Sequence, residues 1–92
     1  EFMKKILVAT GTSVNKMKFA VETIKNYCAN KNVECEVKGV NIYEMKLEEE
    51  NPDVLVVIGP SDIKTNIPII MGTAFITKMG MDKTCDEILS HL

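Results

Sequence analysis

Four short segments of the chain carry the patterns of apolar and polar residues that predict β-strands. Residues 6–9 and 54–58 are continuous apolar runs, typical of strands buried on both faces of a parallel sheet. Residues 33–38 alternate apolar and polar side chains, which indicates a strand at a sheet edge with one face toward the core. Residues 68–71 predict a fourth strand that begins with Pro68, a position where proline is tolerated.

Apolar residues spaced by three and four predict two longer helices. The first opens by Met17 and ends at residues 30–32, and the last follows Gly80. Their buried faces are Met17, Ala20, Val21, Ile24, Tyr27 and Cys28 in the first helix, and Met81, Cys85, Ile88, Leu89 and Leu92 in the last.

A short helix is predicted between the second and third strands. Asn41 and Glu44 have the spacing of a capping box, so the helix runs through Ile42, Met45 and Lys46. Residues 48–50 then form a solvated acidic end. Residues 72–79 are predicted as a loop.

This order of elements predicts an α/β fold with three layers, in which helices flank a parallel sheet of four strands. The first and third strands are the most apolar, so the predicted strand order is 2-1-3-4. Ligands bind open α/β sheets where the strand order reverses, beyond the carboxyl ends of the strands. The loops at 10–16, 59–62 and 72–78 meet at this edge of the predicted sheet.

Length and composition limit the classes of protein to consider. The 92 residues suit one domain over 3–92, with residues 1–2 as a cloning remnant. A net charge of −2 and scattered lysines argue against a nucleic-acid-binding surface. We find no apolar run of the roughly 18 residues that span a membrane and no signal peptide, so we expect a cytoplasmic protein.

The cysteines are Cys28, Cys35 and Cys85, an odd number without a CxxC pair. They suit a reducing compartment better than a disulfide framework or a zinc site, and all three fall on apolar faces. We therefore expect core packing and no metal. The single histidine, His91, is expected to be an exposed residue near the end of the chain.

Residues 10–17 are the candidate binding loop, predicted to lie between a buried strand and a helix start. Lys16 and Lys18 lie near that start, and no acidic residue precedes Glu22. Each exposed cation there opposes the helix macrodipole by about 0.3–1 kcal/mol, so the pattern favours a bound anion, and we predict phosphate.

Three known kinds of phosphate site fit this loop poorly or in part. A Walker loop needs a second glycine before its lysine, and the chain has none there. The loop of a low-molecular-weight phosphatase needs a cysteine and an arginine, and both are absent from this loop. Residues 10–15 resemble the hydroxyl-rich FMN-phosphate loop of flavodoxins, which remains a less favoured alternative because the chain is short for that fold.

From residue 3 to residue 92 the sequence resembles the galactitol-type enzyme IIB component of the bacterial phosphoenolpyruvate-dependent sugar phosphotransferase system (PTS). The matching positions are residues 4–9, Gly11, Val14, 20–22, 24–25, 67–69, Gly72, Phe75 and Gly80. The resemblance implies a cytoplasmic phosphotransferase without a cofactor. Such a protein accepts phosphate from a histidine of enzyme IIA and passes it to a sugar at the membrane component, enzyme IIC.

The resemblance also assigns the site residues. The family's phosphoacceptor cysteine falls on Thr10, and Gly11, Thr12, Ser13, Val14, Asn15, Lys16 and Met17 form the phosphate-binding loop. A Thr-Ser pair of the family falls on Lys16 and Met17. Threonine does not ionise near neutral pH as a thiol does, so Thr10 departs from the pattern at the nucleophile itself.

Two interpretations of Thr10 stay open: a natural IIB-derived domain that binds a phosphorylated partner without catalysis, or an altered form of an active carrier. Asp62 and Lys64 are candidates for anion or partner contacts, with an ordinary surface loop favoured. A group of apolar residues near the same edge predicts either core packing or a docking patch for IIA or IIC: Met71, Phe75, Ile76, Met79 and Met81.

Overall fold

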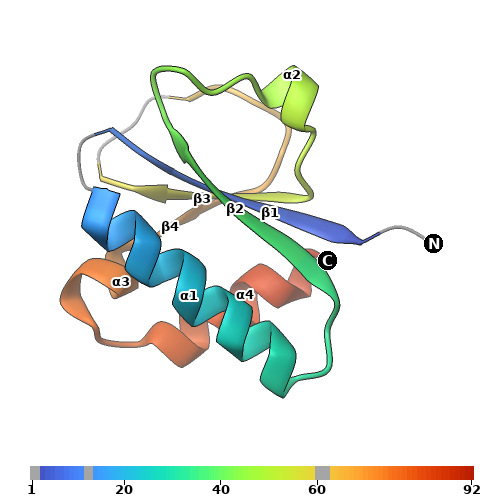
Figure 1. Ribbon diagram of the computed structural model, residues 1–92, viewed down its shortest axis with the longest axis vertical. Coiled ribbons are helices and arrows are strands. Elements are labelled where there is room, and N and C mark those ends of the chain that lie inside the picture. The colour runs from blue at the N-terminus through green and yellow to red at the C-terminus, as the bar shows by residue number, and fades with distance from the viewer. Residues whose placement is uncertain (1–2, 12–13, 60–62) are drawn as a thin grey trace.

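Four parallel strands form the sheet at the centre of the computed structural model, which describes residues 3–11, 14–59 and 63–92 (Figure 1). The strands are β1 (Lys4–Thr10), β2 (Cys35–Asn41), β3 (Val54–Ile58) and β4 (Ile69–Met71). Their order is β2-β1-β3-β4, and all three pairings are parallel. The predicted sheet, strand order and fold class are confirmed.

The two continuous apolar runs occupy the centre of the sheet. From Ile6 to the end of β1, and through all of β3, every residue is buried. β2 lies at an edge and alternates more exposed and more buried residues from Cys35 to Lys38. Because a central strand of a parallel sheet is covered on both faces, only the continuous apolar segments suit those positions.

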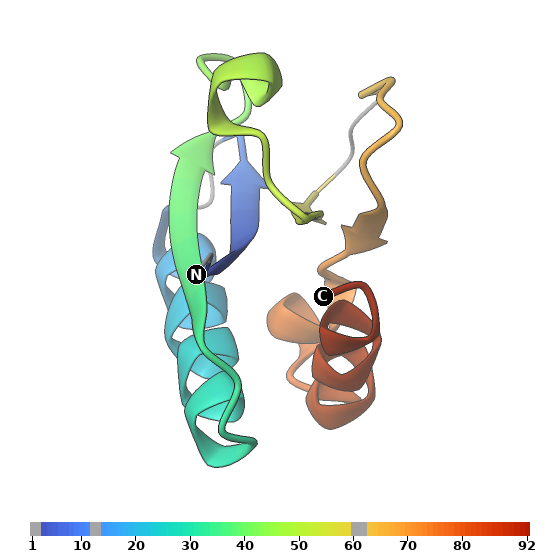
Figure 2. The same ribbon diagram turned by 90° about the vertical axis from the view of Figure 1, so that its right-hand side faces the viewer.

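Three helices cover one face of the sheet: α1 (Val14–Asn30), α3 (Thr73–Thr77) and α4 (Met81–Ser90). α1 lies along β2 and β1, while α3 and α4 contact β3 and β4 (Figure 2). Side chains from both sides of this interface form the larger core, including Ile6, Val8, Ile24, Phe75 and Ile88. None of the helices formed by the described residues has the length and apolar character that a bilayer crossing requires.

Mostly non-helical chain covers the other face. Leu7, Ala9, Leu55 and Val57 pack there beneath residues that surround the one-turn helix α2 (Leu47–Glu50) and residues of the segment before β4. In Figure 1 this layer lies above the sheet, opposite the three helices. The third layer is therefore thin, since α2 is its one helix among the described residues.

The predicted short helix was misplaced. Residues 42–44 form a turn, and the helix occupies the acidic segment that was expected to follow it. Asn41 is the last residue of β2, and its side-chain oxygen accepts the N–H of Tyr43 at 2.8 Å. The same side-chain-to-backbone bond caps helices and closes Asx turns, so the local spacing did not distinguish the two.

Other boundaries also moved. α1 begins at Val14 rather than near Met17, and β2 continues through the predicted turn at 39–41 because its pairing with β1 extends to Thr10 and Asn41. The predicted loop at 72–79 contains α3, whose Ala74 and Phe75 are buried. Burial of these side chains against the other helices stabilises a turn of helix that the loop interpretation missed.

Glu50 joins α2 to the sheet through two ion pairs, and we predict an acid-dependent loss of stability from it. Its carboxylate accepts from Lys5 Nζ and from Lys38 Nζ, each at 2.7 Å. These lysines hold the pKa of Glu50 below its ordinary value of 4.5. A lowered folded-state pKa contributes stability above the unfolded value, and this contribution is lost as the pH falls through the folded value.

Glu50→Gln should therefore lower the melting temperature at pH 7, and the difference from the unmodified chain should shrink in thermal melts run below pH 4.5. Glu48→Gln is the control, because Glu48 is exposed and is in no ion pair within the described part of the chain. Equal melting temperatures for Glu50→Gln and the unmodified chain at pH 7 would contradict the prediction.

Candidate functional site at the start of α1

Thr10 lies where the strand order reverses, at the carboxyl end of β1. It pairs with Asn41 of β2 on one side and with Ile58 of β3 on the other. Its backbone oxygen also accepts the N–H of Ile42 at 2.9 Å. Thr10 is 3% exposed and is the one polar residue in the buried part of the described chain. The sheet therefore fixes the position at which the loop leaves β1.

The loop leads directly into α1, whose first turn is formed by Val14, Asn15, Lys16 and Met17. This turn contains no acidic residue. The first N–H groups of a helix have no partner within the helix, and with the helix dipole they favour an anion. Thr12 and Ser13 lie outside the described residues, as does Asp62. The structure therefore describes the two ends of the predicted loop, residues 10–11 and 14–17.

Lys16 and Met17 have different surroundings although they are adjacent. Lys16 is exposed, as is Lys18 beyond it, so both cations are available at this end of α1. Met17 packs against the larger core, and its sulfur would lie 2.9 Å from a Cβ built at Gly39. The side chain of Met17 is therefore committed to α1–β2 packing, and only its backbone N–H can serve an anion.

Tyr43 lies beside the loop and was not among the predicted site residues. A Cβ built at Gly11 would be 3.1 Å from Cε2 of Tyr43 and 3.4 Å from its hydroxyl oxygen. Tyr43 is nonetheless 82% exposed. No local pattern predicts this contact, because the two residues meet only through the pairing of β1 with β2.

A hollow lies between the N-terminal part of α1 and the helix α3 with its C-terminal cap. It is lined by Asn15, Lys16, Phe19, Phe75, Ile76 and Lys78. The ammonium group of Lys78 lies 5.1 Å from the centroid of the Phe19 ring, within the range of a cation–π interaction. Two cations thus border an apolar floor next to the start of α1.

Of the apolar residues predicted near this edge, some are packed in the core and others are exposed, as a docking patch would require. Phe75 is 1% exposed and belongs to the core, and Met81 packs partly against it. Met71, Ile76 and Met79 are exposed, at 53%, 38% and 75%. Lys64 is exposed as well.

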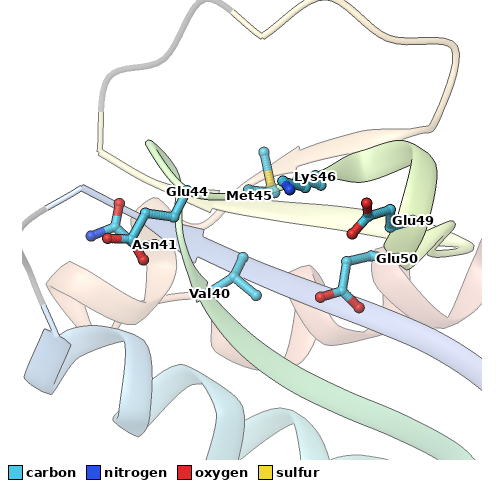
Figure 3. A pocket seen from close by; sticks show the side chains of 7 residues that line it. All are labelled: Val40, Asn41, Glu44, Met45, Lys46, Glu49 and Glu50. Atoms are coloured by element: carbon cyan, nitrogen blue, oxygen red, sulfur yellow. The ribbon is translucent and has the colours of Figure 1, made fainter.

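A second hollow, between the end of β2 and α2, has the opposite charge. Figure 3 shows Asn41 and Glu44 at one end of it and Glu49 and Glu50 at the other. Lys46 is the single cation among its lining residues within the described chain. Three carboxylates in one hollow disfavour an anion, so phosphate binding is expected at α1 and not here.

The three cysteines lie away from the candidate loop. Cys35 pairs with Lys4, at the opposite end of β1 from Thr10. Burial raises the pKa of Cys28 to about 12, and a hydrogen bond with Cys35 adds to this. Burial likewise raises the pKa of Cys85 to about 11. Thiols with such pKa values are protonated at neutral pH and are weak nucleophiles, so neither replaces a thiol at position 10.

The architecture is that of a IIB domain of the sugar phosphotransferase system. The structure superposes with a TM-score of 0.71 on the lactose-specific IIB component domain from Streptococcus pneumoniae, covering 98% of both chains at 13% sequence identity. At that identity the likeness concerns the fold.

The predicted resemblance to galactitol-type IIB components is confirmed. The chain is 28% identical over 90 residues to the galactitol-specific EIIB component of the PTS from Escherichia coli K12, covering 97% of this chain and 96% of that protein. No family model matches the sequence.

Proposed function

We propose that this chain is a IIB component of galactitol type, whose loop 10–17 binds the phosphoryl group carried by a histidine of enzyme IIA. The observation that carries the proposal is the acid-free start of α1 at the strand-order reversal, in a chain similar to a galactitol-specific EIIB over nearly all its length. The N–H groups of Gly11 and of residues 14–17 then hold the phosphoryl oxygens, and Lys16 adds a cation.

In an active carrier of this kind, a thiolate attacks phosphorus, the bond from phosphorus to the histidine nitrogen breaks, and a bond from phosphorus to sulfur forms. A second transfer at enzyme IIC passes the phosphoryl group to the sugar hydroxyl. Thr10 occupies the acceptor position in this proposal. Its hydroxyl is a far weaker nucleophile than a thiolate, and a phosphothreonine ester would be a poor donor to sugar.

The chemistry of Thr10 favours a second candidate function. Its side chain carries a hydroxyl where the family has a thiol, and a hydroxyl is a weak nucleophile toward a phosphohistidine on another protein. In this second function the chain is a IIB-derived module that binds a phosphorylated partner without becoming phosphorylated itself. Both functions use the same loop, and they differ only in whether a covalent bond forms at position 10.

The hollow between α1 and α3 is the proposed contact surface for enzyme IIA. Ile76 and Phe19 supply apolar area there, while Lys16 and Lys78 supply positive charge beside the loop. A partner that presents a phosphohistidine would bring negative charge to this place. Met79 follows Lys78 in the chain and is exposed, so it offers the same partner an adaptable apolar side chain.

A phosphorelay experiment tests both candidate functions. The chain is incubated with phosphoenolpyruvate, enzyme I, HPr and a galactitol-type IIA, and its mass is followed with time. We expect no added phosphoryl group on the chain, together with shifts of the Gly11 and 14–17 amides in NMR spectra when phosphorylated IIA is present. A labile phosphoryl group at Thr10 would support the carrier function. If phosphorylated IIA causes no shift of the Gly11 and 14–17 amides, both candidate functions are refuted.

A further inference from the structure

Tyr43 and Gly11 form a contact that neither core packing nor the sheet requires. The tyrosine ring occupies the space into which a side chain at position 11 would project, with its hydroxyl oxygen 3.4 Å from that Cβ position. Gly11 is the residue at which the proposed phosphate loop leaves β1. The phenol group therefore lies against the loop backbone itself.

Two hydrogen bonds hold the backbone that carries Tyr43. The N–H of Ile42 donates to the carbonyl of Thr10 at 2.9 Å, which ties this turn to the end of β1. The N–H of Tyr43 donates to the side-chain oxygen of Asn41 at 2.8 Å, which closes the Asx turn. The position of Tyr43 is thus set from both β1 and β2.

The environment of Tyr43 differs from that of the other tyrosine of the chain. The hydroxyl of Tyr27 is hydrogen-bonded to a carboxylate oxygen of Asp86, on the helical face of the sheet. Tyr43 is 82% exposed, and no hydrogen bond of its hydroxyl occurs among those seen in the described residues. A tyrosine hydroxyl has one hydrogen to donate, and Gly11 beside it opens the proposed phosphate loop.

We propose that Tyr43 is a further phosphoryl-binding residue, which donates its O–H to an oxygen of the group held by the backbone of Gly11. This inference rests on the proposed function, because the ligand is the phosphoryl group of that site, either as free phosphate or on the IIA histidine. Asn41 then acts as a positioning residue, because it fixes the turn and does not itself touch the ligand.

Inorganic phosphate is the first probe, titrated at constant ionic strength into the full chain while backbone amides are followed by NMR. Tyr43→Phe keeps the ring against Gly11 and removes the donor. A lost hydrogen bond to a charged group should weaken phosphate binding by about tenfold, measured on the Gly11 and 14–17 amides. Without phosphate, the amide shifts of α1 should stay unchanged.

Tyr27→Phe is the matched control, since it removes the same atom from a tyrosine remote from the loop. It should leave phosphate affinity unchanged. The chain has 2 tyrosines and no tryptophan, so its near-ultraviolet absorbance reports on these two rings. A tyrosine difference spectrum on phosphate addition should persist in Tyr27→Phe and be lost in Tyr43→Phe.

The outcomes separate this inference from the proposed function. If the loop amides bind phosphate with equal affinity in Tyr43→Phe and in the unmodified chain, Tyr43 has no part in binding while the loop proposal stands. If the unmodified chain responds neither to phosphate nor to phosphorylated IIA, both fail together. A Tyr43-dependent response to phosphorylated IIA beyond that to unphosphorylated IIA would identify the partner-borne group as the ligand.

Discussion

Thr10→Cys is expected to turn a chain that gains no labile phosphoryl group into one that IIA phosphorylates to near completion. Cysteine thiols at helix N-termini have lowered pKa values, because the unpaired N–H groups and the helix dipole stabilise the thiolate. The first turn of α1 offers that environment without an opposing acid. The substitution therefore supplies a nucleophile that ionises near neutral pH at the place where the proposed function needs one.

The measurement is the mass of the chain after incubation with phosphoenolpyruvate, enzyme I, HPr and IIA. Thr10→Ser is the matched control, because it makes the side chain smaller but keeps a hydroxyl, and it should stay unphosphorylated. Acid and base stability of the adduct then distinguishes a thiophosphate from a phosphate on His91. If Thr10→Cys gains no phosphoryl group from an IIA that does phosphorylate its own IIB partner, the carrier mechanism is contradicted.

Phe75→Ala should cause the largest loss of stability among the substitutions considered. The Phe75 side chain is 1% exposed and packs in the larger core, so truncation leaves a cavity. Large-to-small changes of this kind cost about 3–5 kcal/mol, out of a typical total of about 5–15 kcal/mol for a domain. We expect the melting temperature to fall by at least about 12 °C, since 1 kcal/mol shifts it by roughly 4–8 °C at this size.

Ile76→Ala is the matched control for that experiment. It removes an apolar side chain from the adjacent position, which is 38% exposed and lines the proposed IIA surface. Thermal melts followed by circular dichroism should show a large loss for Phe75→Ala and a small one for Ile76→Ala. A small loss of melting temperature for Phe75→Ala would contradict its assignment to the core and would favour the docking-patch interpretation of Phe75.

The local pattern was enough to predict the sheet, and the reason is visible at its centre. Residues 6–9 and 54–58 are apolar at every position, so neither face of either strand can be left in water. That requirement puts both strands inside a parallel sheet. The alternation of apolar and polar residues around Cys35 and Val37 then indicates that β2 lies at an edge of the sheet, and the strand order follows from these positions.

The pattern failed where a local signal had two structural meanings. Asn41 and Glu44 have the spacing of a helix cap, yet Asn41 ends β2 and closes a turn. The pairing of Asn41 with Thr10 keeps it extended, and pairing with another strand is not visible in a short window of sequence. At α3, likewise, burial of Ala74 and Phe75 against neighbouring elements decides between helix and loop.

The sequence by itself determined the class of fold, the edge of the sheet where a ligand would bind and the basic, acid-free helix start, because each follows from the order and polarity of neighbouring residues. Only the tertiary structure decided that Thr10 is buried and that Tyr43 lies on Gly11. These are contacts between residues far apart in the chain. They depend on the register in which β1 and β2 pair, and no local pattern encodes that register.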